Sequence, residues 1–121
     1  MICFKNFAPF SSLKETEFSI LENLTNKKQY RKGDTILKEG QVAENIIFLN
    51  SGIVSSVYTQ KTKKFIRDFY FPPHIFTEQE SFEKQIPAKF SIISVTDISC
   101  HFMSKDNLEN AYNRIPSLKG I

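Results

Sequence analysis

The chain has 121 residues, with 16 basic and 13 acidic side chains, 40% hydrophobic residues and two cysteines. That length suits one compact domain, which buries a core without disulfide bonds and leaves no room for a second full domain. The net charge of +3 is mild, whereas a nucleic-acid-binding domain usually concentrates its basic residues far more strongly. No run approaches the roughly 18 apolar residues of a membrane span, and residues 1–5 lack the layout of a signal peptide. We therefore expect a single-domain cytoplasmic protein without membrane contact.

The first predicted element is a helix over about residues 12–26. Ser12 and Glu15 have the spacing of a capping box, in which a hydroxyl and a carboxylate satisfy free backbone donors at a helix start. Leu13, Ile20 and Leu24 then fall on one helical face. The polar residues 26–28 are expected to end the helix.

From Tyr30 onward the apolar residues alternate with a period of two, which is typical of β-strands. The expected strands lie at residues 35–38, 45–49, 53–59, 65–71, 90–95 and 98–103. Turn signals separate them, and Gly33, Gly40 and Gly52 all fall in turns, where a positive φ is often required. Many short strands at such spacing, between about residues 30 and 103, predict an all-β sandwich or barrel and not a parallel α/β sheet.

Two shorter helical segments complete the prediction. Residues 78–82 fit a single helical turn between strands, and Ser104 fits the cap of a last helix over about 105–114. Basic residues cluster at 27–32 and at 61–64, where turns are expected, so we interpret them as solvated loop charges and not as a phosphate track. The twelve phenylalanines are spread along the chain, as core residues would be.

No catalytic or metal-binding set emerges. Cys3 and Cys100 are far apart and have no C-x-x-C partner, which argues against a zinc ribbon, an iron–sulfur cluster or a disulfide framework. Cys100 lies in an alternating apolar run and is expected to be a buried reduced thiol. The only histidines, His74 and His101, have no ligand-like spacing, and phosphate-binding glycine loops are absent. The sequence predicts a protein that is not an enzyme, although a cupin-like metalloenzyme would share the β-roll.

The order of the turns carries a resemblance to a known family. The residues are Lys32-Gly33-Asp34-Thr35-Ile36-Leu37, then Glu39-Gly40, Ile47-Phe48-Leu49 and Ser51-Gly52. In this order and spacing the chain resembles the cyclic-nucleotide-binding domain of the Crp/Fnr (catabolite activator protein-like) family of bacterial transcription regulators, over about residues 18–115. The resemblance implies a double-stranded β-helix or jelly-roll barrel with helices at both ends.

The resemblance also implies where a ligand would bind. Family members that bind cAMP hold its phosphate in a cassette, with backbone N–H groups at a short helix start and a bidentate arginine, while a glutamate accepts from the ribose hydroxyl. By this comparison Glu78 fills the glutamate position, Thr77 replaces a glycine, and Glu80 places a negative charge where a small residue is usual. The arginine position falls on Ala88, with Lys89 beside it.

Loss of the arginine–phosphate pair costs roughly 2–5 kcal/mol, or about 10²–10³-fold in affinity. We therefore expect an eroded cAMP site, in which cAMP is at most a weak ligand. The candidate ligand contacts are Phe76, Thr77, Glu78, Gln79, Glu80, Ser81, Ala88 and Lys89.

Two functions remain open. The first is the sensor domain of a Crp/Fnr-like regulator, in which a small-molecule effector near residues 76–91 shifts the C-terminal helix, the expected contact of a homodimer. DNA binding would then need a helix-turn-helix domain in a longer chain, because only 18 residues follow Met103. The alternative is a ligand-free protein-interaction or dimerisation module on the same fold, with Tyr70 and Phe71 as candidate interface aromatics, although core packing would also explain both side chains.

Overall fold

The computed structural model describes residue 7 and residues 12–118. Their elements, in chain order, are α1 (Glu15–Asn23), β1 (Asn26–Tyr30), β2 (Thr35–Leu37), β3 (Asn45–Ser51), β4 (Val54–Gln60), β5 (Lys63–Tyr70), β6 (His74–Phe76), α2 (Gln79–Lys84), β7 (Ser91–Ser94), β8 (Ile98–Ser104), α3 (Lys105–Arg114) and the short 3-10 helix η3 (Pro116–Leu118).

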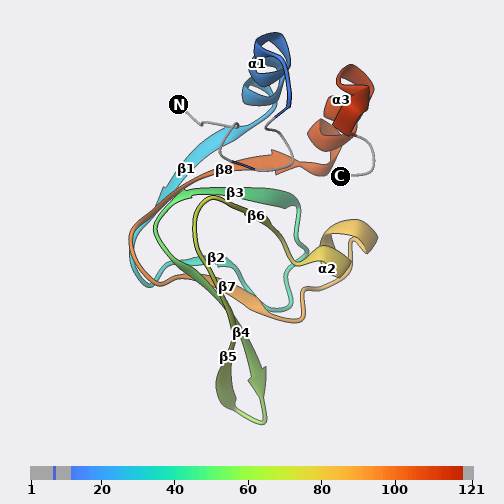
Figure 1. The fold of residues 1–121 in the computed structure, drawn as a ribbon. Coiled ribbons are helices and arrows are strands. Elements are labelled where there is room, and N and C mark those ends of the chain that lie inside the picture. Colours follow the sequence, from blue (N-terminus) through green and yellow to red (C-terminus); the bar gives the residue numbers. More distant parts are fainter. Residues whose placement is uncertain (1–6, 8–11, 119–121) are drawn as a thin grey trace.

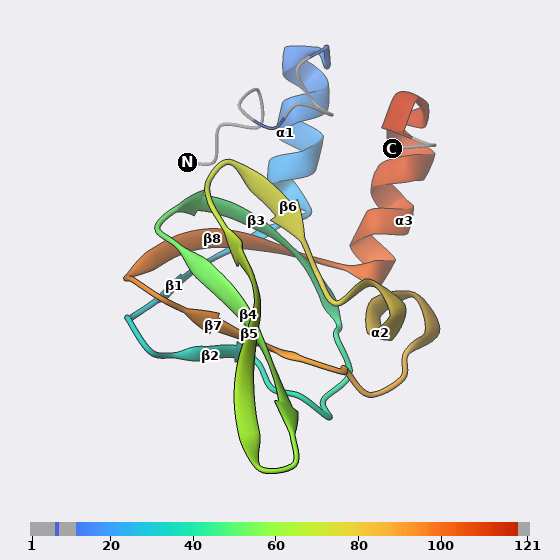
Figure 2. The same ribbon diagram turned by 60° about the horizontal axis from the view of Figure 1, so that its bottom comes forward.

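The strands form two antiparallel four-stranded sheets that face each other as a β-roll. One sheet has the order β1-β8-β3-β6 and the other has the order β2-β7-β4-β5. Helices α1 and α3 lie outside the first sheet, α2 lies beside the roll, and the β4–β5 hairpin projects from the opposite end (Figures 1 and 2). The predicted mainly β jelly-roll with flanking helices is confirmed.

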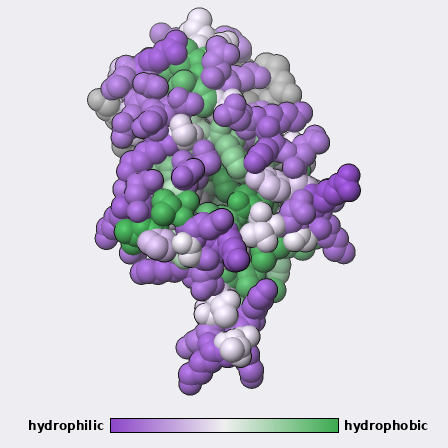
Figure 3. All heavy atoms as spheres, turned by 180° about the vertical axis from the view of Figure 1, so that it is seen from behind, coloured by the Kyte–Doolittle hydropathy of each residue, from purple (hydrophilic) through white to green (hydrophobic). Residues whose placement is uncertain are grey.

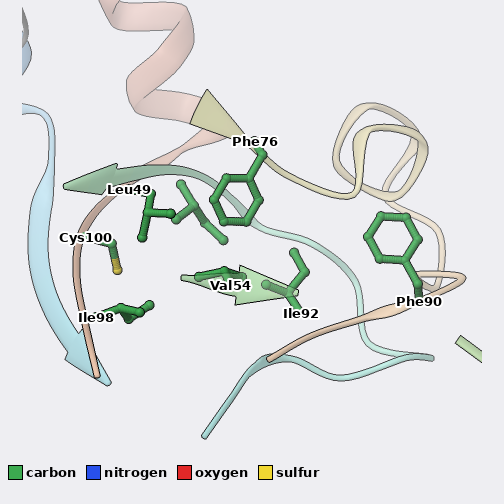
Figure 4. Packing of buried hydrophobic residues seen from close by; sticks show 8 residues of the cluster. Leu49, Val54, Phe76, Phe90, Ile92, Ile98 and Cys100 are labelled. Carbon is green, nitrogen blue, oxygen red and sulfur yellow. The ribbon is translucent and has the colours of Figure 1, made fainter. Parts of the chain in front are cut away.

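Strand alternation divides the core into two layers. In β3, Ile47 and Leu49 point between the two sheets, whereas Phe48 points to the helices. The inner layer contains residues of both sheets, such as Ile92 and Cys100, and Figure 4 shows these side chains converging inside the roll. The roll is therefore closed by its own side chains.

The second layer joins the helices to the first sheet. Phe48 and Met103 on the outer face of that sheet pack with Leu21 of α1 and Ala111 of α3, and all four are at most 2% exposed. The amide Nδ2 of Asn107 in α3 also donates to the carbonyl of Leu24, 3.0 Å away, which joins the two helices. Both helices are thus held by apolar burial, the dominant favourable term in folding.

Gly52, in the turn between β3 and β4, meets a strict backbone requirement. Its φ is +89°, and a Cβ at this position would lie 2.3 Å from the carbonyl oxygen of Asp97. A side chain here would therefore clash with backbone. The predicted glycine turns are confirmed, since Gly33 and Gly40 also have positive φ.

The boundaries of the first helix differ from the prediction. The helix starts at Glu15 and not at Ser12, and its first turn is closed by Glu17, whose Oε1 accepts from the backbone N–H of Lys14 at 2.9 Å. It ends at Asn23, and residues 26–30 form β1 instead of a helix end. A strand forms in this polar segment because β8 pairs with all five of its residues.

Two strands were missed and two side-chain predictions need correction. No alternation of apolar residues marks β1, and none marks β6, a three-residue strand after two prolines. The phenylalanines are not all core residues, because Phe69 and Phe71 are 50% and 60% exposed. Of the two candidate interface aromatics, Tyr70 packs against the inner core and Phe71 does not.

Cys100 is buried and unpaired, as predicted. Burial raises the pKa of its thiol to about 11, because a low-dielectric environment disfavours the thiolate. A thiol in this state is inert, since the thiolate is the reactive form. Cys100 is therefore a core residue and not a redox site.

Candidate functional site

A cavity of about 780 Å³ lies between β5, β6, α2 and α3. Eight of its lining residues are apolar or aromatic: Ile46, Tyr70, Ile75, Phe76, Phe82, Phe90, Leu108 and Tyr112. Small-molecule sites in proteins have volumes of about 300–1,000 Å³ and mostly apolar walls. The cavity therefore has the size of a site for a metabolite-sized ligand, and half of its lining residues are polar or charged.

One wall of the cavity is a stack of aromatic rings. The rings of Tyr70 and Phe76 are parallel within 1° and their centres are 4.6 Å apart, and the ring of His74 stacks on Tyr70 at 5.2 Å. The hydroxyl of Tyr70 donates to Oγ of Ser56 at 3.3 Å and accepts from Nη1 of Arg67 at 3.4 Å. These contacts fix the Tyr70 ring, so this wall is held in place before any ligand binds.

The side chain of Arg67 lines the cavity and packs on an aromatic ring. Its guanidinium carbon is 4.5 Å from the centre of the Phe90 ring, and its Nη1 is 3.7 Å from Oδ2 of Asp68. A guanidinium over a ring face gains a cation–π contact, but here it already has a carboxylate partner.

The charged side chains that line the cavity are mostly acidic. The acids are Asp68, Glu78, Glu83 and Glu109, and the bases are Arg67 and Lys105. The Nζ of Lys105 donates to the backbone carbonyl of Glu83 at 2.8 Å, so it is also engaged. An excess of acidic side chains creates a negative potential in a confined site, which disfavours an anionic ligand.

Glu78 turns its carboxylate inward, onto backbone amides of two separate segments. It is 5% exposed and caps the start of α2. Its Oε1 accepts from the N–H groups of Glu80 at 3.1 Å and Ser81 at 3.4 Å, and its Oε2 accepts from the N–H of Lys89 at 2.9 Å. Because buried amides need acceptors, this one side chain joins the start of α2 to the segment that leads into β7.

The segment opposite α2 offers no cation to this point. Ala88 is 3% exposed, and its backbone pairs with Gly40 and Gln41 of the neighbouring loop. The Lys89 side chain is 70% exposed, and its Nζ lies 3.4 Å from Oε1 of Glu80. The carboxylate of Glu78 is therefore held by amide dipoles and not by a charged partner.

The fold that holds this site is shared with known proteins. A model of the cyclic nucleotide-binding domain matches residues 27–114, which is most of the chain. The chain belongs to the cyclic nucleotide-binding domain family.

Solved structures of this family share the fold at low identity. The catabolite activator protein of Thermus thermophilus has a TM-score of 0.80 and 17% identity, with 91% of this chain and 52% of that chain covered. The sensor domain of the transcriptional regulator DNR from Pseudomonas aeruginosa has a TM-score of 0.81 and 16% identity, with 95% and 77% covered. The resemblance to regulators of the Crp/Fnr type is thus confirmed at the level of fold.

A third structure comes from a kinase and not from a transcription regulator. It is the regulatory subunit of a cAMP-independent protein kinase A from Trypanosoma brucei, with a TM-score of 0.80 and 16% identity, and 95% of this chain and 42% of that chain covered. That protein is a triple variant, with glutamate changed to alanine, threonine to arginine and valine to alanine, and it is bound to cAMP in the A site. The present chain spans about half the length of the Thermus protein, and a search of curated proteins found no match.

Within this cyclic nucleotide-binding domain, the eight candidate residues do not all meet. Glu78, Glu80, Ser81 and Lys89 gather around the Glu78 carboxylate, with Ala88 next to Lys89. The other three, Phe76, Thr77 and Gln79, line the cavity together with Glu78. The Oγ1 of Thr77 donates to the carbonyl of Asn45 at 2.8 Å, and the Nε2 of Gln79 donates to Glu83.

Sequence reasoning missed several residues of the cavity. Arg67 lies at an irregularity in the β4–β5 register, between the pairs Ser56↔Asp68 and Val57↔Ile66. Lys105 and Tyr112 reach the cavity only because α3 packs back over it. No local pattern in the sequence marks these positions.

Three further observations concern metal ligands, membrane-spanning helices and a buried histidine among the described residues. Among residues 7 and 12–118, no group of three or more His, Cys, Asp and Glu side chains is arranged to hold a metal ion. No helix in that part of the chain is both long and apolar enough to cross a bilayer. His101 is buried, with its Nδ1 2.9 Å from Oδ1 of Asn50, and burial lowers its pKa below 6.5.

Proposed function

We propose that this domain is the effector sensor of a Crp/Fnr-type regulator in which the cassette for a cyclic phosphate is filled by its own Glu78. The observation that carries the proposal is the inward carboxylate, which accepts from the N–H groups of Glu80, Ser81 and Lys89. A carboxylate resembles a phosphate in charge and in its acceptor oxygens. A cyclic nucleotide would have to displace it before it could reach these amides.

The charges around the cassette support the same proposal. A phosphate at this place would lie near Glu78 and Glu80, while Ala88 supplies no cation and Lys89 is already paired with Glu80. Removing a charge-assisted pair with phosphate weakens binding by about 10²–10³-fold. Glu78 in its amide contacts is also unavailable to accept from a ribose hydroxyl.

The Trypanosoma brucei structure provides a design for the test. That subunit is described as cAMP-independent, and the variant that binds cAMP gains an arginine and loses a glutamate. The corresponding kinds of change here are Glu80→Ala, Ala88→Arg and Lys89→Ala. They remove one acid, add the missing cation and remove the side chain paired with Glu80.

Calorimetric titration with cAMP and cGMP, with thermal shift as a check, tests the proposal. We expect no saturable heat from the natural chain at millimolar nucleotide, and micromolar binding of cAMP by the triple variant. Glu44→Ala is a matched control, because it removes an exposed acid that does not line the cavity. Micromolar binding by the natural chain would overturn the proposal.

The cavity also provides a route from an effector to the C-terminal helix. Its lining includes Phe82 and Glu83 of α2 and Leu108 and Tyr112 of α3, and Lys105 already joins the two helices through the Glu83 carbonyl. An effector in the cavity therefore contacts both helices, and it favours whichever arrangement it binds better. The proposed effector is a neutral or weakly charged small molecule with a flat apolar part. Aromatic rings line the cavity, and most of its charged side chains are acidic.

Hydrogen exchange measures this coupling directly. In the triple variant saturated with cAMP, we expect a change in amide protection over α3. Unchanged protection over residues 105–114 would argue against signalling through this helix. Contact with DNA would be made by a helix-turn-helix domain of a longer chain, and a homodimer would form through the C-terminal helix.

The alternative, a ligand-free protein-interaction module on the same fold, is favoured by a separate observation. The exposed large hydrophobic side chains lie in the β4–β5 hairpin and just after it, away from the cassette. An interaction through this hairpin is compatible with an empty or an occupied cavity.

A further inference from the structure

The β4–β5 hairpin, residues 54–70, carries the whole net charge of the chain. It contains Lys61, Lys63, Lys64 and Arg67 against the single acid Asp68, a net charge of +3. The remaining residues carry 12 basic and 12 acidic side chains, so their formal charges cancel. The positive charge is therefore concentrated on one projecting element.

The same element and the residue that follows it carry the exposed large hydrophobic side chains of the described residues. They are Phe65, Ile66, Phe69 and Phe71, with exposures of 40%, 60%, 50% and 60%. Seen from behind, the tip of the hairpin is hydrophilic and hydrophobic side chains gather where it joins the body (Figure 3). Contiguous exposed apolar side chains bordered by polar ones are typical of interaction sites.

Strand pairing places two of these side chains together. Ile66 is paired with Val57 and Phe69 with Ser55, on the face opposite to Val54 and the inner core. Phe71 comes directly after the last paired residue of β5 and is also exposed. Phe65 lies on the other face, where its ring stacks on Tyr58 at 5.4 Å. We call the row Ile66, Phe69 and Phe71 the outer row.

The charges and the shape of the hairpin select the kind of partner. A second copy of the chain would bring two +3 hairpins together, and edge lysines such as Lys63 and Lys64 oppose pairing between edge strands. Insertion into a membrane requires apolar side chains at the tip, but here the tip is basic and the outer row lies toward the body. A nucleic acid would use the lysines but would leave the aliphatic Ile66 without a stacking role.

We propose that the hairpin binds an acidic segment of a partner protein, whose apolar side chains cover the outer row and whose carboxylates pair with the lysines at the tip. The proposal is independent of whether the cavity holds an effector. Electrostatic attraction would speed the encounter and the outer row would hold the complex, as in interfaces with an apolar centre and a charged rim.

Fluorescence anisotropy with three labelled 12-residue peptides tests the proposal. The first alternates acidic residues with leucine and phenylalanine, the second has lysine in place of the acids, and the third has serine in place of the apolar residues. We expect saturable binding of the first alone, weakened by added salt because the charges are exposed. Binding of all three alike, or of none at millimolar peptide, would overturn the proposal.

Variants of the hairpin locate the contact. The double substitution Lys63→Glu with Lys64→Glu should weaken binding of the acidic apolar peptide roughly tenfold or more. Lys27→Glu with Lys28→Glu, a matched exposed pair in β1, should leave binding unchanged. Ile66→Ser with Phe69→Ser should abolish binding, and thermal melts of each variant exclude unfolding as the cause. Equal effects of the two lysine pairs would contradict a hairpin site.

Three parallel measurements separate the other occupants. A labelled 12-nucleotide single strand, vesicles of phosphatidylcholine with phosphatidylserine, and sedimentation of the chain alone probe nucleic acid, membrane and self-association. Binding of the strand or the vesicles that exceeds peptide binding and is lost in the Lys63→Glu, Lys64→Glu variant would overturn the assignment to a protein partner. Self-association lost in Ile66→Ser would do the same in favour of a second copy.

Discussion

The cassette at the start of α2 and the β4–β5 hairpin both line the cavity, but they differ in whether their side chains have partners within the domain. At the start of α2 the backbone amides already have an acceptor, since Glu78 is 5% exposed and accepts from three of them. In the hairpin, Ile66 and Phe69 are exposed. Its four basic side chains face a single acid of the same element, Asp68. The polar groups at the start of α2 thus have partners within the domain, whereas the exposed apolar side chains of the hairpin have none that cover them.

The largest expected effect contrasts an isoleucine beside the cassette with one in the hairpin. Ile92→Ala empties a fully buried core position and should lower the free energy of unfolding by about 2–5 kcal/mol. Ile66→Ala alters a side chain that is 60% exposed and should change it by no more than about 0.5 kcal/mol. Urea unfolding measures both. Similar losses would mean that the outer row is part of the core.

The root of the hairpin is expected to be rigid. Gly52→Ala places a Cβ against the Asp97 carbonyl at a positive φ, whereas Gly33→Ala meets the same φ strain with no atom within 4 Å. The φ strain costs about 1–2 kcal/mol in each variant, and the clash should add about 1–3 kcal/mol for Gly52→Ala. Thermal melts compare the two. Equal costs would show that the turn moves away from Asp97 easily.

The next effect concerns the carboxylate in the cassette. Glu78→Ala leaves the amides of Glu80, Ser81 and Lys89 without their acceptor and should destabilise the domain by about 1–3 kcal/mol. Glu83→Ala, on the exposed side of the same helix, should have almost no effect. Urea unfolding of both variants decides the matter. A neutral Glu78→Ala would mean that water replaces the carboxylate, and the cassette would then be open to ligands.

The smallest expected effect is the pH dependence of stability that comes from His101, a buried residue of β8 outside both regions. Burial holds the pKa of His101 below 6.5 in the folded chain, so below about pH 6.5 the unfolded chain binds a proton that the folded chain does not. Stability should therefore fall as the pH drops from 7.5 to 5.5, and the fall should be smaller in His101→Gln. The hairpin contains no histidine, so peptide binding should not follow this titration. An unchanged slope in His101→Gln, with His74→Gln as control, would assign the fall to another group.

Much of the fold was predictable because its signals are local. Alternation of apolar residues marked the strands that enter the inner core, and glycines marked turns whose positive φ other residues avoid. β1 was not predictable in this way, since its residues are polar and it exists because β8 offers an antiparallel partner. The start of the first helix was misplaced because a capping box at Ser12 and a glutamate at Glu17 both fit a helix start locally.

The candidate site was only partly predictable. The resemblance located Glu78 and Ala88, but the direction of a carboxylate depends on which amides surround it, and Lys89 lies 11 residues from Glu78. Arg67 could not be assigned to the cavity, because a register irregularity changes which side chains of β5 face inward. The exposure of Phe71 was not expected, because alternation shows that a strand has two faces and not whether both are covered.

The sequence by itself determined the mainly β class, the order of most elements and the glycine turns, because periodicity and φ preference act over a few residues. The family was indicated by a resemblance in the order and spacing of the turns. Only the tertiary structure decided that the Glu78 carboxylate accepts from distant backbone amides, that Arg67 packs on Phe90 and that the outer row lacks a covering layer. Each of these depends on segments that are distant in sequence and meet only when the sheets close. Burial and hydrogen-bond partners are properties of that closure, and no local pattern contains them.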